Sequence, residues 1–292
     1  MPSRNAMNKT KLNKRFWTVV LSTAMLLSFV QYSSNAQSTS VIVSKDTLTK
    51  KTQRIKRPKI YRTEFSGGFR LNTDGYSFFL ERAKLENLES RMRNRFFKAR
   101  FFSLEFTEKK HPQEVKQRSK STASGGENPE RPFIYGKMNN FYAFKLGYGG
   151  RNLIAGKPER GNVAVSWVYN GGVSVGLLKP YYVQAFVYNG SQFEEKSITY
   201  SDTSAAEFLT VQNIIGGSGF AKGIQEIKVV PGLHVRAAIH FDFAIKTNTV
   251  LAFESGFTAE IYTKKIELMA LKEAFPYTAN IYLAFQFGKR FH

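Results

Sequence analysis

The residues of this chain that could carry chemistry are few, and most of them are charged. The 292-residue sequence has no cysteine and four histidines, which leaves no thiolate nucleophile, no disulfide and no thiolate metal site. Hydrolysis or transfer of a lipid acyl group would need a nucleophile, a base and an orienting acid within hydrogen-bond reach. The sequence lacks a Gly-x-Ser-x-Gly motif, which would mark a nucleophile elbow. We therefore predict that the protein is not an enzyme, and we keep a lipid-modifying enzyme as an alternative.

One group of residues resembles a metal site. His234, His240 and Asp242 share one face of an alternating segment. Two residues six positions apart on a strand lie about 20 Å apart, because a strand rises about 3.3 Å per residue, so both histidines cannot hold one ion. Two glycine-rich stretches, 147–150 and 216–219, lack the strand–loop–helix context of a phosphate-binding loop. The sequence predicts no metal and no cofactor.

The charged residues occur in segments whose side chains alternate between apolar and polar, which is typical of strands with one apolar face. The last segment is the most regular, with Ile281, Leu283, Phe285, Phe287 and Phe291 on one face. A sheet that crosses a bilayer must close on itself, because hydrocarbon cannot satisfy the hydrogen bonds of an open edge. A C-terminal strand with one regular apolar face is typical of barrels in which the last strand pairs with the first and closes the sheet. We predict an all-β fold, an antiparallel transmembrane β-barrel.

Eight segments follow this pattern, at residues 61–71, 76–86, 96–107, 139–150, 163–177, 233–243, 251–261 and 281–291. The third has phenylalanines at both parities, which leaves its inward face ambiguous and allows a bulge. Connections at 87–95, 151–162 and 245–250 are short, whereas those at 108–138, 178–232 and 262–280 are long and the one at 72–75 is a hairpin. This alternation favours eight strands with long extracellular loops. Tyr181–Tyr188 could be a further strand, which would extend the wall beyond the membrane or raise the total to ten.

If the apolar faces point to lipid, the polar positions point into the lumen. Side chains rather than water fill a barrel of eight strands, and buried charges must be paired. We expect a lumen network with acids and bases evenly matched, made of Arg62, Glu64, Arg70, Glu81, Lys145, Arg236, His240, Asp242, Glu254, Glu260 and Arg290. Such a network predicts a rigid salt-bridged plug. The alternative is a pore for a small solute, which ten strands would favour.

The N-terminal region carries a targeting signal. Five basic residues precede an apolar stretch at 16–30, and Ser34, Asn35 and Ala36 supply the small residues of a cleavage site. We predict a signal peptide over residues 1–36 with cleavage near Ala36, a basic flexible periplasmic segment over 37–60, and an outer-membrane barrel over 61–292. The absence of cysteine excludes a lipoprotein anchor.

The formal net charge of +21 could indicate nucleic-acid binding, but an exported chain does not meet nucleic acid as its usual partner. We expect contacts with outer-membrane lipid, with lipopolysaccharide phosphates through the loop at 109–131, with the barrel assembly machinery and with other envelope proteins. The connection at 178–232 is too long for a mere connector. We expect it to cap the barrel mouth or to present a surface to a partner, with short helical character at 205–212 and 222–228.

Several motifs carry a resemblance to a known group of proteins. They are Ser34–Gln37, Gly67–Arg70 followed by Thr73–Tyr76, Asn139–Tyr142, Ser166–Gly172, Leu178–Tyr182 and Phe287–Phe291. Together they resemble a family of outer-membrane β-barrel proteins from Bacteroidota, over most of the mature chain. The resemblance implies location and fold, and it carries over no catalytic residue. The resulting hypothesis is an integral barrel with a filled polar lumen that is structural or binds partners through its outer loops.

Overall fold

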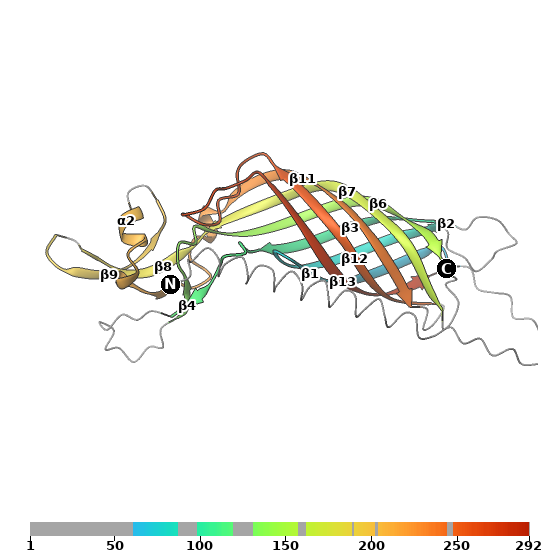
Figure 1. The fold of residues 1–292 in the computed structure, drawn as a ribbon, viewed down its shortest axis with the longest axis horizontal. Helices are drawn as coiled ribbons and strands as arrows, with labels where there is room; N and C mark the ends of the chain where they lie inside the picture. Colours follow the sequence, from blue (N-terminus) through green and yellow to red (C-terminus); the bar gives the residue numbers. More distant parts are fainter. Residues whose placement is uncertain are drawn as a thin grey trace, which may run out of the picture. The chain divides into compact units, whose positions relative to one another are not determined.

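The prediction of a closed eight-stranded barrel is confirmed. The computed structural model describes residues 61–86, 98–118, 131–156, 162–188, 190–201, 204–243 and 248–291, all within one compact unit, Lys56–His292. Eight antiparallel strands close in the order β1-β13-β12-β11-β7-β6-β3-β2 (Figure 1). The predicted signal peptide at 1–36 and basic segment at 37–60 lie outside the described residues. Among the described residues, no helix is long and apolar enough to cross a membrane.

The strands match the predicted segments and extend several of them. Their bounds are β1 Thr63–Asn72, β2 Gly75–Glu86, β3 Lys98–Lys109, β6 Asn139–Ala155, β7 Val163–Pro180, β11 Lys228–Phe243, β12 Thr249–Tyr262 and β13 Tyr277–Phe291. β6 and β7 stay paired from Asn139 opposite Pro180 to Ala155 opposite Val165. Backbone pairing therefore continues beyond the residues whose apolar alternation marks the strand.

The closing strand is the one that the C-terminal sequence predicted. β13 pairs with β1 from Thr63 opposite Phe291 to Asn72 opposite Tyr282, and with β12 on its other side. On the outward face, the rings of Phe69 and Phe285 stack with centroids 5.3 Å apart. Every edge of the sheet is thereby paired, which is what a wall in contact with hydrocarbon requires.

The barrel has two different ends. β1 begins and β13 ends at one of them, which we name the terminal end. At the other, the lobe end, a separate three-stranded sheet forms in the order β10-β8-β9. Figure 1 shows β8, β9 and α2 at the opposite end of the barrel from the C-terminus.

The lobe comprises residues 182–226. It contains most of the segment Tyr181–Tyr188, which could have been a ninth or tenth strand of the wall. β8 (Tyr182–Tyr188) pairs with β9 (Phe193–Thr199) and β10 (Ile214–Gly217), and none of the three joins the barrel. Short helices α2 (Ala205–Phe208), η2 (Val211–Asn213) and η3 (Ile224–Glu226) complete it, near the stretches where helical character was expected. β5 (Phe133–Ile134), which pairs with β4 (Lys116–Gln117), adds a residue to the lobe core, which consists of Phe133, Val183, Ala185, Ile198, Phe208 and Ile214.

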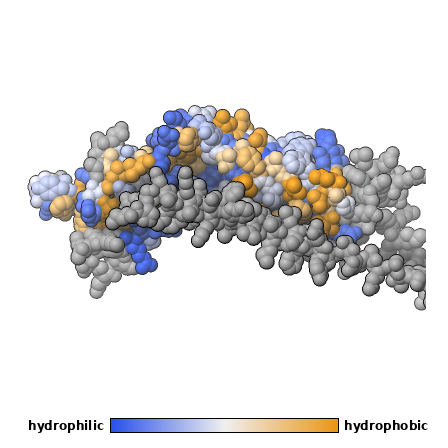
Figure 2. Space-filling model, viewed as in Figure 1, coloured by the Kyte–Doolittle hydropathy of each residue, from blue (hydrophilic) through white to orange (hydrophobic). Residues whose placement is uncertain are grey.

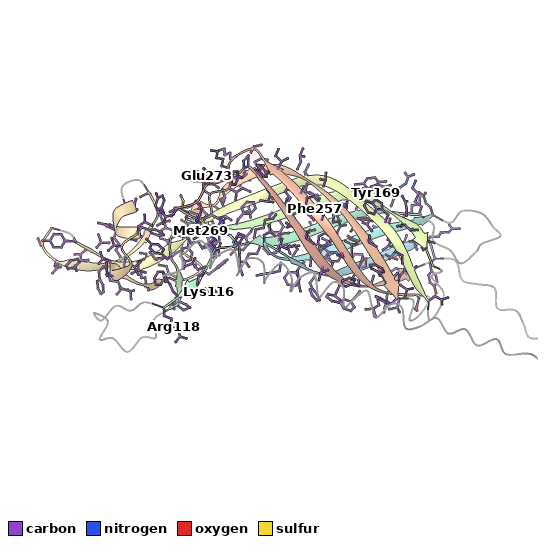
Figure 3. All side chains as sticks on the ribbon, in the orientation of Figure 1. Lys116, Arg118, Tyr169, Phe257, Met269 and Glu273 are labelled. Atoms are coloured by element: carbon purple, nitrogen blue, oxygen red, sulfur yellow. The ribbon has the colours of Figure 1, made fainter. Side chains whose placement is uncertain are left out.

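The outward face of the wall is apolar and exposed. Along β13 each odd residue from Tyr277 to Phe291 is exposed, while the even ones are buried or intermediate. The same alternation exposes large apolar side chains on every barrel strand, among them Phe78, Phe102, Leu146, Val173, Val235 and Phe257. Figure 2 shows apolar patches along the wall, and in Figure 3 Tyr169 and Phe257 lie on it. A water-soluble protein would bury residues of this kind.

The ambiguous third strand has one inward face. Phe101 is buried in the lumen and Phe102 is exposed, and β3 pairs with β2 and β6 without a register shift over residues 98–109. The bulge that the sequence allowed is therefore absent from this described part of β3. Phe101 can point inward because the guanidinium of Arg236 lies 5.6 Å from its ring centroid, a favourable cation–π distance.

Candidate functional site

The lumen holds the main concentration of charged side chains. Ten of the eleven residues in the expected lumen network are buried: Glu64, Arg70, Glu81, Lys145, Arg236, His240, Asp242, Glu254, Glu260 and Arg290. Arg62 is exposed and is therefore not in this network. It precedes the first residue of β1 and donates its backbone N–H to the Phe291 carbonyl oxygen.

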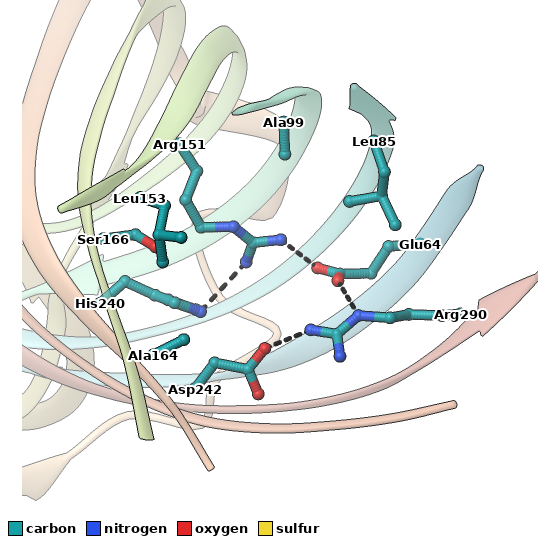
Figure 4. Close-up of a pocket in the computed structure, with 10 residues that line it drawn as sticks. All are labelled: Glu64, Leu85, Ala99, Arg151, Leu153, Ala164, Ser166, His240, Asp242 and Arg290. Carbon is teal, nitrogen blue, oxygen red and sulfur yellow. Dashed lines mark hydrogen bonds and ion pairs between the residues drawn. The ribbon is translucent and has the colours of Figure 1, made fainter. Parts of the chain in front are cut away.

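At the terminal end, the network links β1, β6, β11 and β13 (Figure 4). Arg151 lies 2.5 Å from Glu64, whose other oxygen accepts a hydrogen bond from Arg290 at 2.9 Å. Arg290 also pairs with Asp242, and Arg151 lies 3.1 Å from the His240 ring nitrogen. The cavity that these side chains line has a volume of only about 20 Å³, about enough for a single water.

In the middle of the barrel, two arginines from opposite sides share one carboxylate. Arg70 lies 3.2 Å and Arg236 lies 2.9 Å from the same oxygen of Glu81. Arg70 also pairs with Glu105, and its guanidinium lies 3.8 Å from the centroid of the Phe79 ring. Arg236 reaches Glu254 at 3.5 Å, and Glu254 bonds His240 at 3.2 Å. The middle is thus joined to the terminal end through His240.

Toward the lobe end, lysines replace arginines. Lys145 lies 3.1 Å from Glu105 and 2.5 Å from Glu260. Lys109 lies 3.0 Å from Glu260 and 3.2 Å from Asp74, which belongs to the β1–β2 hairpin. These contacts carry the network to the rim of the barrel.

The contacts form one unbroken series from rim to rim. In order it runs Asp242, Arg290, Glu64, Arg151, His240, Glu254, Arg236, Glu81, Arg70, Glu105, Lys145, Glu260, Lys109 and Asp74. Each buried cation in it touches at least one carboxylate, which offsets the large penalty of taking a charge out of water. Neutral donors add to it, since Tyr282 donates to Glu254 at 2.6 Å and Gln286 donates to Glu81 at 3.1 Å. Chemically, the arrangement fills and cross-links the lumen.

Sequence reasoning missed several members of this series. Glu105 escaped because the inward face of its strand was ambiguous, and Arg151 because it falls in the expected turn at 151–162. Lys109 and Asp74 lie at a strand end and in a hairpin, where alternation gives no direction. One signal could have found Glu105. If Phe102 is placed on the lipid face, the odd-numbered residues of the strand, Phe101 and Glu105 among them, must face the lumen.

The two lumen histidines belong to different parts of the network. His240 contacts Arg151 and Glu254, whereas His234 contacts the Ser174 hydroxyl at 3.0 Å and the Asn170 amide oxygen at 3.2 Å. Within the described residues, no cluster of histidine, aspartate and glutamate is placed to hold a metal ion.

The order Ser174, His234, Asn170 resembles the hydrogen-bond order of a nucleophilic triad. However, Ser174 is buried at 2% exposure, so its hydroxyl is shielded from solvent. We interpret these three residues as part of the filled lumen.

No protein-family model matches this chain, and no curated protein matches it by sequence. Among solved structures, it resembles Ail, the attachment invasion locus protein of Yersinia pestis, in complex with the heparin analogue sucrose octasulfate, with 12% identity, a TM-score of 0.36, and coverage of 80% of this chain and 100% of Ail. Neisserial surface protein A has 7% identity and a TM-score of 0.34, with 79% and 95% covered. A major outer membrane protein from Thermus thermophilus has 8% identity and a TM-score of 0.39, with 78% and 99% covered.

Proposed function

We propose that this protein is an integral outer-membrane barrel that acts as a rigid, non-conducting anchor and holds the lobe on the outer side of the membrane. The observation that carries the proposal is the unbroken series of buried ion pairs and hydrogen bonds from Asp242 to Asp74. A solute or ion crossing the lumen would have to separate several of these pairs. Separating a buried pair is strongly unfavourable, so the lumen is a structural element rather than a path.

The membrane location rests on the outward face of the wall. A closed sheet with large apolar side chains on the outward face of every strand satisfies its backbone hydrogen bonds internally and presents an apolar band to lipid, with charged outward residues such as Arg82 and Lys289 near the terminal end. The short connection between β11 and β12 lies at the terminal end, and the long ones lie at the lobe end. In bacterial barrels the short turns face the periplasm, which supports an extracellular position for the lobe.

Conductance in planar lipid bilayers tests the closed lumen directly. We expect the purified full-length protein, reconstituted at high density, to give no discrete conductance steps. Steps that scale with protein concentration would contradict the anchor and favour the alternative of a small-solute pore.

Fractionation tests the location independently. We expect the processed protein in the membrane pellet after lysis and ultracentrifugation, and a shift in gel mobility between unheated and boiled samples, because a closed barrel resists unfolding by detergent. A folded protein in the supernatant would overturn the proposal.

The proposal also covers how the protein is processed and assembled, and from which bacterial phylum it comes. We infer that residues 1–36 are removed after Ala36, and the intact mass of the mature protein, which should begin at Gln37, tests this. The regular β13 supports recognition by the barrel assembly machinery. The motif resemblance supports an origin in Bacteroidota.

The lobe supports the partner-binding side of the proposal. It has its own apolar core, and it carries exposed aromatic residues at the β8–β9 turn, where the rings of Tyr188 and Phe193 lie 5.3 Å apart. A folded element of this kind requires more sequence than a connector. It is therefore the surface to be tested for envelope partners or lipopolysaccharide.

A further inference from the structure

A cleft of about 440 Å³ lies on the outside of the wall at the lobe end. Three barrel strands contribute to it, with Glu108 and Lys110 at the end of β3, Asn140 at the start of β6, and Lys179 at the end of β7. Lys179 has the same parity along β7 as Val173 and Val175, which are exposed on the outward face. The cleft therefore opens on the lipid-facing side of the wall, above the apolar surface, rather than into the lumen.

The opposite wall of the cleft comes from residues outside the barrel. Arg131 and Pro132 precede β5, Gly217 is the last residue of β10 that pairs with β8, and Ser218 and Gly219 follow it. A Cβ at Gly217 would lie 3.2 Å from the Tyr181 hydroxyl oxygen, so glycine allows this close approach. The glycine-rich stretch at 216–219, which lacks the context of a phosphate-binding loop, thus contributes Gly217, Ser218 and Gly219 to a cavity.

The cations that line the cleft outnumber the acids. Lys137 is paired with Glu114 at 2.7 Å, and Lys110 lies 3.7 Å from Glu108. Those two pairs use both of the acids that line the cleft. The remaining cations are Lys116, Arg131 and Lys179, and Lys116 lies at the lobe end in Figure 3.

Lys179 is the unusual member of this group. The residue is buried at 4% exposure, and none of the ion pairs among the described residues includes it, since Glu108 and Glu114 pair with other lysines. Its ammonium group lies 4.8 Å from the centroid of the Phe220 ring, a cation–π contact that offsets only part of the cost of burial. A buried cation without a carboxylate is strained electrostatically, and an anion bound in the cleft would relieve that strain.

The other walls are suited to a sugar. Tyr181, Tyr182 and Phe220 supply aromatic surface, and Asn140 and Ser218 supply uncharged hydrogen-bonding groups. Burial raises the pKa of the Tyr181 phenol, and the hydrogen bond to Glu226 raises that of Tyr182. Both phenols are therefore neutral at physiological pH and do not repel an anion. The volume also falls within the range of small-molecule sites.

We propose that this cleft binds a phosphorylated sugar, with Lys179 as the buried anchor for its phosphate and Lys116 and Arg131 as the outer cations. The position above the apolar wall favours the head group of a lipid in the outer leaflet as its source, and this part rests on the proposed membrane location. A soluble sugar phosphate offers the same chemistry. The two sources differ only in whether an acyl chain follows the wall below the cleft.

The experiment uses the full-length protein purified in a phosphate-free detergent, with Lys179→Met as the test variant. Glucose 1-phosphate and inorganic phosphate are titrated calorimetrically, with glucose as the neutral probe. Nanodiscs of phosphatidylethanolamine, with and without lipid A, test the lipid source by co-purification. Lys228→Met is the matched control, because it removes the same charge from an exposed position at the start of β11, outside the cleft.

We expect glucose 1-phosphate to bind the wild-type protein and the Lys228→Met variant alike. Lys179→Met should weaken that binding at least tenfold, because it removes a charge-assisted hydrogen bond. Enrichment of lipid A by the wild type but not by Lys179→Met identifies the lipid source, and binding of the soluble phosphate alone identifies the soluble one. Failure of both probes, or equal binding by Lys179→Met and the wild type, overturns the proposal.

A second measurement separates loss of binding from loss of folding. Lys179→Met should unfold at the same or a higher temperature than the wild type, since methionine packs against Phe220 without a charge to desolvate. If the protein fractionates as soluble, the membrane location fails while the detergent titration still tests the cleft. If it fractionates in the membrane but binds neither probe, only the cleft proposal fails.

Discussion

The lumen and the outer cleft both contain buried cations, but the two regions differ in whether those cations have carboxylate partners. In the lumen, Lys145 is held between the carboxylates of Glu105 and Glu260. In the cleft, Lys179 is also buried, and among the described residues its ammonium group faces an aromatic ring instead of an acid. Pairing makes the first region a structural element, because its charges are already satisfied. The lack of pairing makes the second a site that an external anion completes.

The largest expected effect comes from removing one lysine from each region. Lys145→Met leaves Glu105 and Glu260 with fewer partners and should destabilise the barrel by about 3–5 kcal/mol. Lys179→Met should leave the stability unchanged or raise it. Urea unfolding of both variants in the same lipid vesicles measures the difference. Equal losses of stability in the two variants would remove the distinction between the regions.

A second comparison sets the wall against the lobe. Leu146 in β6 and Phe193 in β9 are both exposed, at 59% and 65%. Leu146→Arg should cost about 2–4 kcal/mol in vesicles if lipid surrounds the wall. Phe193→Arg should change the stability by less than about 0.5 kcal/mol, because water surrounds the lobe. Similar small changes in both variants would mean that water, not lipid, contacts the wall.

Salt should separate the two regions without any substitution. Raising the salt concentration from about 0.05 M to about 0.5 M shortens the screening length severalfold. We expect the affinity for glucose 1-phosphate to fall severalfold, since an entering anion competes with chloride and its attraction is screened. The unfolding free energy should change little, because the lumen pairs are buried from the salt. Unfolding titrations and calorimetry at both concentrations test this.

The smallest expected effect comes from converting a paired cation into an unpaired one. Glu114→Gln keeps the shape of the side chain but leaves Lys137 without its carboxylate at the edge of the cleft. The affinity for glucose 1-phosphate should rise about threefold, which corresponds to about 0.65 kcal/mol. Glu226→Gln is the control, since Glu226 bonds the Tyr182 hydroxyl and forms no ion pair within the described residues. A rise in both variants would point to the overall charge rather than to Lys137.

The local pattern of the chain was sufficient for the architecture. Eight alternating segments became eight wall strands, and Ile281, Leu283, Phe285, Phe287 and Phe291 lie on the outward face of the strand that closes the sheet. Such prediction succeeds because alternation along a strand directly determines which side chains face lipid and which face the lumen. The local pattern was insufficient to place Tyr181–Tyr188, because a strand with the same kind of sequence can pair with strands outside the barrel.

The ion-pair partners across the lumen could not be predicted from the sequence, for a different reason. Arg70 and Glu105 are 35 positions apart, and Arg290 and Glu64 are 226 apart. Their contacts depend on the strand order and on the stagger between strands, which no local pattern encodes. The sequence predicted that lumen charges must be paired, but it did not predict which pairs would form or that they would join into one series.

By itself, then, the sequence determined an eight-stranded sheet with one apolar face and one charged face, because a period of two is a property of each strand alone. Only the tertiary structure decided that Lys145 meets two carboxylates while Lys179 meets none among the residues that the structure describes. Whether a buried charge is satisfied depends on neighbours brought together by closure of the barrel and by the folding of residues 131–134 and 214–220 against its rim. Physical proximity, and not residue type, distinguishes the filled lumen from the cleft.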